Sequence, residues 1–211
     1  MTQPLTDQLQ TITQVWFDFG QVCSQRQDRR PLSRIADHLE MTLTDLLAAY
    51  HEHRFGYDQG LLSAAQYWSR VAGYQPLAID WLIAQDYASW NRKNHPLLAF
   101  VAELIARQVP VLLLSNMPFD FKRRLQIDWP ELAAFSQCYF SCDLGFCKPD
   151  PAIYRWVLRD SGFSAEQSLF LDDMPANIEA AEQIGMHGVL FSDTAVALTA
   201  IAENYQIKGR N

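Results

Sequence analysis

The sequence predicts an α/β fold: a Rossmann-like, doubly wound parallel sheet with a helical subdomain inserted after the first strand. Short, continuous apolar runs recur along the chain, as expected for strands that are buried on both faces of a sheet. Amphipathic segments of helical length separate most of these runs, which is typical of βαβ units. Residues 22–95 show helical periodicity only. We therefore expect a core made of residues 1–21 and 96–211, and a helical cap made of residues 22–95.

The composition narrows the class of protein. A chain of 211 residues with 49% hydrophobic residues can bury a full core and hold an inserted subdomain. The net charge of −7 argues against binding to nucleic acid or anionic membranes, and the densest basic patch, at 26–30, is too small to neutralise a phosphate backbone. No apolar run reaches the length of a bilayer span, and the N-terminus lacks a signal-peptide pattern. We expect a cytoplasmic protein with no membrane or nucleic-acid partner; monomer and homodimer both stay open.

The cysteines favour reduced thiols over a zinc site or disulfides. They are Cys23, Cys138, Cys142 and Cys147. Three of them lie close together, but without a CxxC pair or an interleaved histidine, which structural zinc sites usually have. Disulfide frameworks belong to small secreted proteins of a different composition.

The first strand is expected at residues 13–18, where apolar residues lead into a single carboxylate, Asp18. Gly20 follows as the chain turns. We expect the polar residues 1–12 to form a mobile lead-in to this strand. Open α/β folds place their chemistry at the carboxyl ends of buried strands, so Asp18 is the first candidate for a functional residue.

Four segments of the predicted cap carry apolar residues at helical spacing, and several begin after Pro, Thr or Ser, as helices often do. They span 32–41, 44–53, 63–74 and 77–90. We expect the aromatic residues of the cap mostly to pack in its core. They include Phe55, Tyr57, Trp68 and Trp90. Two histidines, His51 and His53, are expected to face solvent.

After Pro96, helices and strands alternate to the end of the chain. The predicted helices span 97–108, 118–127, 151–162 and 176–185. The predicted strands span 109–115, 137–141, 168–173 and 187–191. The polar tail from about Asn204 is expected to fray.

Polar groups follow four of the predicted strands. They are Asp18, then Ser115 with Asn116, then Lys148, then Asp172 with Asp173. Each group alone could be a helix cap, a turn residue or part of an exposed loop. Because the carboxyl ends of parallel strands meet in one crevice, the four groups together predict one site.

This set of groups suits phosphoryl transfer through an aspartyl intermediate. A carboxylate such as that of Asp18 is ionised at neutral pH and can attack phosphorus directly. Attack by an anion on an anion requires positive charge, and Mg²⁺ with carboxylate ligands can supply it. The Lys148 ammonium would add a point charge, while Ser115 and Asn116 would donate hydrogen bonds to the phosphate.

These residues resemble the loops of the haloacid dehalogenase superfamily, over about 13–22 and 96–191. Its motifs correspond to VLLLSN (111–116), DLGFCKPDPAIY (143–154) and LFLDDMPANIEAAEQIG (169–185). The helical segment is similar to the small cap of that family. Within it, FGYDQGLLSAAQYW (55–68) resembles a stretch found in epoxide hydrolase phosphatase domains and in bacterial sugar-phosphate phosphatases such as glucose-1-phosphatases. Caps of this kind close over small substrates.

The resemblance implies specific roles for the strand-end residues. Asp18 would be the nucleophile and a metal ligand, together with the Gly20 backbone carbonyl and Asp173. Lys148 would hold the phosphate and the nucleophile together. For two further residues, Asp172 and Asn177, the resemblance implies a supporting role at the metal site. It implies a Mg²⁺-dependent phosphatase acting on a small phosphorylated metabolite, with sugar phosphates as one substrate class.

The sequence departs from the superfamily pattern at Gly20. Most phosphatases of this type have an aspartate there, two residues after the nucleophile, which protonates the leaving oxygen and later activates water. A general acid of this kind contributes roughly a hundredfold or more. Asp28 is the nearest following acid in sequence, but the sequence does not place it in the site.

The missing acid keeps two other interpretations open. A 2-haloacid dehalogenase would use Asp18 to attack carbon without a metal, although paired carboxylates beside an anionic substrate disfavour it. A non-catalytic or regulatory protein would keep the fold and only bind a phosphorylated ligand or partner.

Overall fold

The computed structural model describes residues 9–209, and its centre is a five-stranded parallel sheet. The strand order is β4–β3–β2–β5–β6. The bounds are β2 (Gln14–Phe17), β3 (Val111–Ser115), β4 (Gln137–Phe140), β5 (Ser168–Asp172) and β6 (His187–Leu190). After β2, the chain places β3 and β4 on one side of it and then β5 and β6 on the other side. The direction of winding therefore reverses at β2. The predicted doubly wound α/β fold is confirmed.

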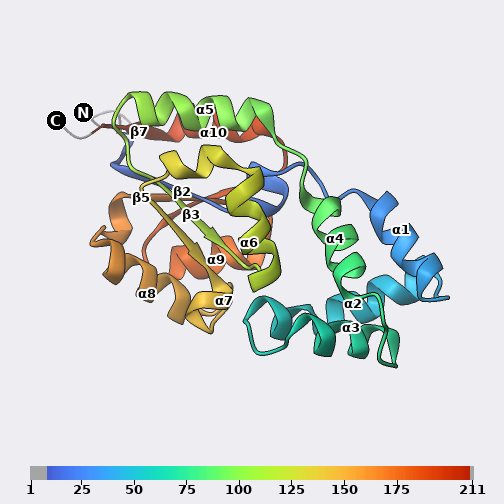
Figure 1. Ribbon diagram of the computed structural model, residues 1–211. Coiled ribbons are helices and arrows are strands. Elements are labelled where there is room, and N and C mark those ends of the chain that lie inside the picture. The colour runs from blue at the N-terminus through green and yellow to red at the C-terminus, as the bar shows by residue number, and fades with distance from the viewer. Residues whose placement is uncertain (1–8, 210–211) are drawn as a thin grey trace, which may run out of the picture.

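Helices cover both faces of this sheet, which explains why its strands are continuous apolar runs. In Figure 1, α5 (His95–Ala106) and α10 (Thr194–Asn204) lie on one face, and α8 (Pro151–Ser161) and α9 (Pro175–Gln183) lie on the other. Successive β2 residues pack into opposite layers. Phe17 joins the buried cluster beneath α5 and α10, whereas Trp16 joins the cluster beneath α8 and α9.

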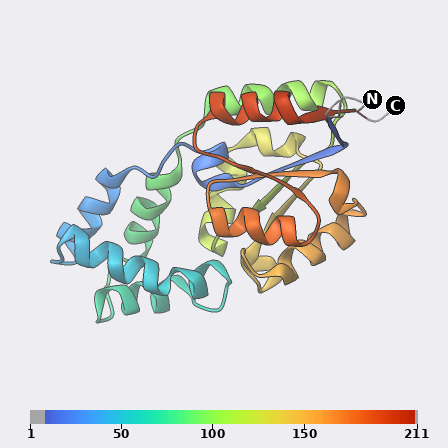
Figure 2. The same cartoon turned by 180° about the vertical axis from the view of Figure 1, so that it is seen from behind.

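Within residues 29–90, between β2 and α5, the chain forms four α-helices that pack around a buried cluster of their own. They are α1 (Arg29–His38), α2 (Leu43–Asp58), α3 (Ala64–Ala72) and α4 (Ile79–Trp90). We call residues 29–90 the helical insertion; it lies to one side of the sheet in both views (Figures 1 and 2). Capping side chains explain where two of these helices begin. Thr42 caps the start of α2, and Ser63 forms a capping box with Gln66 at the start of α3.

The helical insertion also contacts the core directly at the end of α2. Gly60 has a φ of +78°, and a Cβ there would lie 3.0 Å from the Cys142 carbonyl oxygen, so only glycine fits this close approach. Beside it, Ser141 Oγ donates a 2.5 Å hydrogen bond to the Asp58 carbonyl. The insertion is therefore held at its connecting segments and again at this second contact. The boundaries predicted for core and cap stay a prediction.

Two expectations about the chain ends were wrong. Residues Gln10–Ile12, which we expected in a mobile lead-in, form β1, and Tyr205–Ile207 of the expected fraying tail form β7. The two strands pair in parallel, and Ile12 is fully buried. The polar composition of these two segments predicted disorder. Burial of Ile12 and the hydrogen bonds between β1 and β7 order them instead. The remaining lead-in, residues 1–8, and residues 210–211 lie outside the described chain.

The other predicted elements are confirmed, with shifted ends. The confirmed helices include α6 (Phe119–Asp128). The sequence pattern did not predict two helices, α7 (Ser141–Leu144) and α10. All four cysteines are free thiols, as expected, and burial raises the pKa of each. No helix between residues 9 and 209 is long and apolar enough to cross a membrane.

Candidate active site

A cavity of about 360 Å³ opens at the carboxyl ends of β2, β3 and β5. The predicted strand-end residues that line it are Asp18, Gly20, Ser115, Asn116, Lys148, Asp173 and Asn177. They come from segments far apart in the chain, and parallel pairing brings them together at the point where the winding reverses. Of the predicted set, Asp172 lies behind the cavity wall and is fully buried.

Lys148 is the centre of the polar contacts in this cavity. Its side chain is 1% exposed. Its Nζ lies 2.8 Å from Asp18 Oδ1 and 2.6 Å from Asp172 Oδ2, and it donates a 2.8 Å hydrogen bond to the Leu114 carbonyl. Three acceptors therefore surround three ammonium hydrogens, so the position of Lys148 is fixed from three sides.

The cavity has more carboxylates than cations. Asp18, Asp172 and Asp173 place oxygen atoms within 4.8 Å of one another, against the single ammonium of Lys148. Burial raises the pKa of Asp18 to about 6 although Lys148 opposes it, and burial together with Asp18 and Asp172 raises the pKa of Asp173 to about 7. A clustered set of carboxylate oxygens with excess negative charge is the kind of donor set that Mg²⁺ takes.

The two carboxylates that follow β5 have different surroundings. Asp172 Oδ2 bonds to Lys148, while its Oδ1 accepts from the Met174 N–H at 2.8 Å and from Asn177 Nδ2 at 2.9 Å. Asp173 is only half-buried, lines the cavity, and accepts a 2.6 Å hydrogen bond from Gln21 Nε2. Asp172 is thus placed to orient Lys148, whereas Asp173 faces the space that a ligand can enter.

Ser115 and Asn116, at the end of β3, are also placed differently. Ser115 is 2% exposed and lines the cavity, and within residues 9–209 its hydroxyl has no hydrogen-bond partner, so it is available to a ligand. The Asn116 amide makes two reciprocal 2.8 Å hydrogen bonds with the Lys148 backbone. Asn116 therefore joins the loops after β3 and before α8; its predicted contact with phosphate stays a prediction.

Trp90 occupies the space beside Gly20. A Cβ on Gly20 would lie 3.3 Å from Trp90 Cζ3 and 3.8 Å from Asp18 Oδ2. The φ of Gly20 is −64°, so steric crowding by the indole, and not backbone conformation, favours glycine here. Trp90 is half-buried and lines the cavity, whereas Tyr57 and Trp68 pack in the insertion as expected, and Phe55 is 52% exposed.

Sequence reasoning missed the groups that α2 adds to the cavity. They are Tyr50, His51, Arg54 and Asp58. Tyr50, Arg54 and Asp58 are four residues apart and His51 is three residues before Arg54, which places these groups along one side of a helix. This was a usable signal, but nothing in the sequence showed that this side faces the strand ends. His51 is exposed, as predicted, yet it also lines the cavity.

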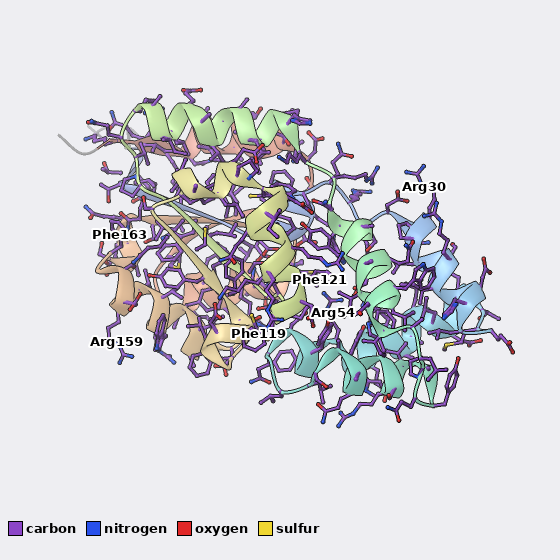
Figure 3. All side chains as sticks on the ribbon, in the orientation of Figure 1. Arg30, Arg54, Phe119, Phe121, Arg159 and Phe163 are labelled. Carbon is purple, nitrogen blue, oxygen red and sulfur yellow. The ribbon has the colours of Figure 1, made fainter. Side chains whose placement is uncertain are left out.

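Arg54 organises these additional groups. Its Nε lies 2.8 Å from Asp58 Oδ1 and its Nη1 lies 2.9 Å from Asp86 Oδ2 of α4, while Nη1 also donates to the Tyr50 hydroxyl. Its guanidinium carbon lies 4.9 Å from the centre of the Phe121 ring of α6, and Figure 3 shows Arg54 and Phe121 facing each other where the helical insertion meets the core. One half-buried cation is therefore shared by two buried carboxylates.

Residues 5–185 match the haloacid dehalogenase-like hydrolase family. The chain is 31% identical over 109 residues to rat bifunctional epoxide hydrolase 2, which covers 50% of this chain and 20% of that protein. It is 29% identical over 106 residues to a sesquiterpene phosphatase of Aspergillus oryzae, covering 49% of this chain and 53% of that protein. The chain thus aligns with about a fifth and about half of these two relatives.

Solved structures share the fold. A haloacid dehalogenase family enzyme from Bacteroides thetaiotaomicron, crystallised with magnesium and inorganic phosphate, has a TM-score of 0.64 at 18% identity, covering 84% of this chain and 93% of that one. A dehalogenase with an intermediate complex also has a TM-score of 0.64, at 14% identity, covering 97% of this chain and 95% of that one. At these identities the similarity concerns the fold, which both kinds of enzyme share.

Proposed function

Because the chain belongs to the haloacid dehalogenase-like hydrolase family, we propose that it is a magnesium-dependent phosphatase that hydrolyses a small phosphorylated metabolite, with sugar phosphates as the substrate class. The observation that carries this proposal is the contact of Lys148 Nζ with Asp18 and Asp172 in a cavity that Ser115 and Asp173 also approach. A relative named as a phosphatase and a structural relative that holds magnesium and phosphate support the same reaction class.

In this proposal Asp18 is the nucleophile. Its carboxylate attacks phosphorus, the bond between phosphorus and the leaving oxygen breaks, and water then hydrolyses the aspartyl-phosphate to release inorganic phosphate. Lys148 holds the attacking carboxylate in place and balances charge on the transferring group. The Ser115 hydroxyl, which has no protein partner among the described residues, donates to a phosphoryl oxygen. Asn116 also faces the cavity while it positions Lys148.

We propose that Asp18, Asp173 and the Gly20 backbone carbonyl hold Mg²⁺. The donor set fits this ion because three clustered carboxylates oppose a single ammonium, leaving an excess of negative charge on oxygen ligands. When bound, magnesium supplies the positive charge that allows an anionic nucleophile to approach a phosphoryl group. Asp172 and Asn177 support the site, because Asp172 accepts a hydrogen bond from Lys148 and Asn177 donates one to Asp172.

We further propose that the helical insertion acts as the cap of this enzyme. Its α2 and α4 contribute Arg54, Asp58 and Trp90 to the cavity wall opposite the strand ends. A wall built from a different part of the fold can select the leaving group without disturbing the phosphate-binding groups. The substrate would then lie between the insertion and the sheet.

Phosphate release tests this function. Asp18→Asn should lower hydrolysis of para-nitrophenyl phosphate with magnesium by about a thousandfold or more, because an amide cannot replace the nucleophile. Asp143→Asn, which changes an exposed carboxylate paired with Lys122, is the matched control and should keep wild-type activity. Undiminished hydrolysis by the Asp18→Asn protein would refute the proposal.

Two outcomes would favour the other interpretations. Turnover of 2-haloacids that continues in EDTA would indicate a dehalogenase, which the same Asp18 and the glycine at position 20 could support. A protein that hydrolyses nothing in a broad panel of phosphoesters, but whose melting temperature rises with magnesium and a phosphate mimic, would be a phospholigand-binding protein.

A further inference from the structure

A phosphatase that uses Asp18 needs a proton donor for the leaving oxygen, and position 20 cannot provide one. Gly20 has no side chain, and the Trp90 ring lies 3.3 Å from the position that its Cβ would occupy. The crowding leaves little room for a carboxylate to enter there by a small shift. Any proton donor must therefore come from another part of the cavity wall.

Asp58, at the end of α2, is a carboxyl group on the opposite wall of the same cavity. Its side chain is 12% exposed. Oδ1 accepts from Arg54 Nε at 2.8 Å, but no group within residues 9–209 donates a hydrogen bond to Oδ2. One carboxyl oxygen is thus held by Arg54 while the other is available to a ligand.

The backbone of Asp58 is fixed relative to the phosphate-binding loop. Ser141 Oγ donates to the Asp58 carbonyl at 2.5 Å and accepts from the Met117 N–H at 2.9 Å. Met117 lies two residues after Ser115, at the end of β3. A two-bond bridge therefore connects Asp58 to the loop that carries the free Ser115 hydroxyl, which holds the insertion wall in register with the strand ends.

The charged groups around Asp58 suit a carboxyl that both donates and accepts a proton. Arg54 favours its ionised form, but Arg54 is shared with Asp86 of α4, and Asp18 adds negative charge from across the cavity. The neighbouring thiols of Cys142 and Cys147 and the Tyr67 hydroxyl remain protonated, since burial raises the pKa of each. Burial outweighs Arg54 and raises the pKa of Asp58 to about 6, close to the pH at which a general acid and base works best.

We propose that Asp58 is the general acid and base of this phosphatase, a role that rests on the proposed function of Asp18. As Asp18 forms its bond to phosphorus, the bond to the leaving oxygen breaks and that oxygen takes the Asp58 proton. The Asp58 carboxylate then takes a proton from the water that attacks the aspartyl-phosphate. The bond from phosphorus to Asp18 breaks, inorganic phosphate leaves, and Asp58 is protonated again.

His51 is another titratable group of α2 that lines this cavity, and the structure supports it less well as the proton donor. It is exposed, and no hydrogen bond to a described residue holds its ring. Burial and the nearby Arg54 lower the pKa of its imidazole, which disfavours the protonated form that a proton donor requires. Asp58, in contrast, is fixed through both its side chain and its backbone.

Dependence on the leaving group tests the role of Asp58, because protonation matters for a basic alkoxide and little for the weakly basic nitrophenolate. Asp58→Asn should lower kcat/KM for glycerol phosphate roughly a hundredfold and for para-nitrophenyl phosphate less than about threefold. Asp86→Asn is the matched control, since Asp86 also binds Arg54 but does not line the cavity. That variant should change both substrates by the same factor.

A measurement on the wild-type enzyme keeps the test independent of how the variant folds. With a series of phosphate esters, log kcat/KM should depend only weakly on the basicity of the leaving group, and the dependence should become steep in Asp58→Asn. Equal losses on both substrates, or a steep dependence already in the wild type, would overturn the role of Asp58 and leave Asp18 untouched. A selective loss in His51→Gln would transfer the role to His51, whereas full activity of Asp18→Asn would overturn both proposals.

Discussion

Replacing Lys148 by methionine should destabilise the protein strongly, because its ammonium lies between two buried carboxylates. Asp18 is 8% exposed, Asp172 is fully buried, and Lys148 is 2% exposed. Methionine keeps most of the side-chain volume, so the substitution removes the charge with little change in packing. What remains is a pair of carboxylates without a counter-charge in a site from which water is largely excluded.

Removing one partner of a buried ion pair lowers the free energy of unfolding by about 3–5 kcal/mol, and we expect Lys148→Met to fall in this range at about pH 8. Lys122→Met is the matched control. Lys122 pairs with Asp143 at 2.7 Å, a distance similar to those of Lys148, but the side chains are 25% and 37% exposed. Solvent screens this pair, so its loss should lower stability by no more than about 1 kcal/mol.

The loss should depend on pH. Burial already raises the pKa of Asp18 to about 6 while Lys148 lowers it, so the pKa rises further when Lys148 is gone. A carboxyl with a raised pKa in the folded protein binds its proton more tightly there than in the unfolded chain. The stability of Lys148→Met therefore falls as the pH rises from about 4 to the raised pKa, and the difference from wild type should be smaller at about pH 5 than at about pH 8.

Urea unfolding at the two pH values, in EDTA, measures these differences directly. The expected order at about pH 8 is wild type, then Lys122→Met close behind it, then Lys148→Met well below both. Equal losses for the two lysine variants would refute the inference that burial controls the energy of these pairs. A loss for Lys148→Met that does not change between the two pH values would refute the assignment of the penalty to ionised carboxylates.

Further predictions concern the glycines and the metal-free protein. Gly60→Ala should lower the free energy of unfolding by about 1 kcal/mol more than Gly73→Ala, since both have a positive φ but only Gly60 lies against neighbouring backbone; equal losses in thermal unfolding would contradict the close contact. Gly20→Asp should lower phosphatase activity because of Trp90, and adding Trp90→Ala should restore part of it; a fully active Gly20→Asp enzyme would show that the indole moves freely. Without metal, the melting temperature should rise as the pH is lowered from about 8 to about 5.5, because the Asp18 pKa is raised to about 6 in the fold, and this rise should be smaller in Asp18→Asn. Magnesium added at about pH 8 should raise the melting temperature of the wild type and have little effect on Asp18→Asn.

The sequence was sufficient for the five strands of the central sheet and for the polar residues that follow them. A parallel strand buried on both faces must be a continuous apolar run, so β2, β3 and β5 could be recognised from sequence alone. The carboxyl ends of such strands share one edge of the sheet. That geometric rule brings Asp18, Ser115 and Asp173 together without any knowledge of the loops between them, whereas Lys148 lies beyond α7 and reaches them through the loop that Asn116 holds.

The strands at the two chain ends could not be predicted from the sequence, because each becomes structured only by pairing with the other. β1 and β7 have three residues each, and neither has a pattern that distinguishes a strand from a polar terminus. Each is a strand because the other is available to pair with it, and because Ile12 is buried against the core. Short elements that depend on distant partners leave no local signal.

The sequence by itself determined the five strands of the central sheet, most of the helices between them, and the polar groups that follow the strands, because local periodicity and the direction of parallel strands fix them. Only the tertiary structure decided how these groups are used. It showed that Asp172 holds Lys148, that Trp90 fills the space beside Gly20, and that Asp58 reaches the same cavity from the helical insertion. These contacts depend on how the insertion docks on the core, and packing between distant surfaces, not the pattern along either segment, sets that orientation.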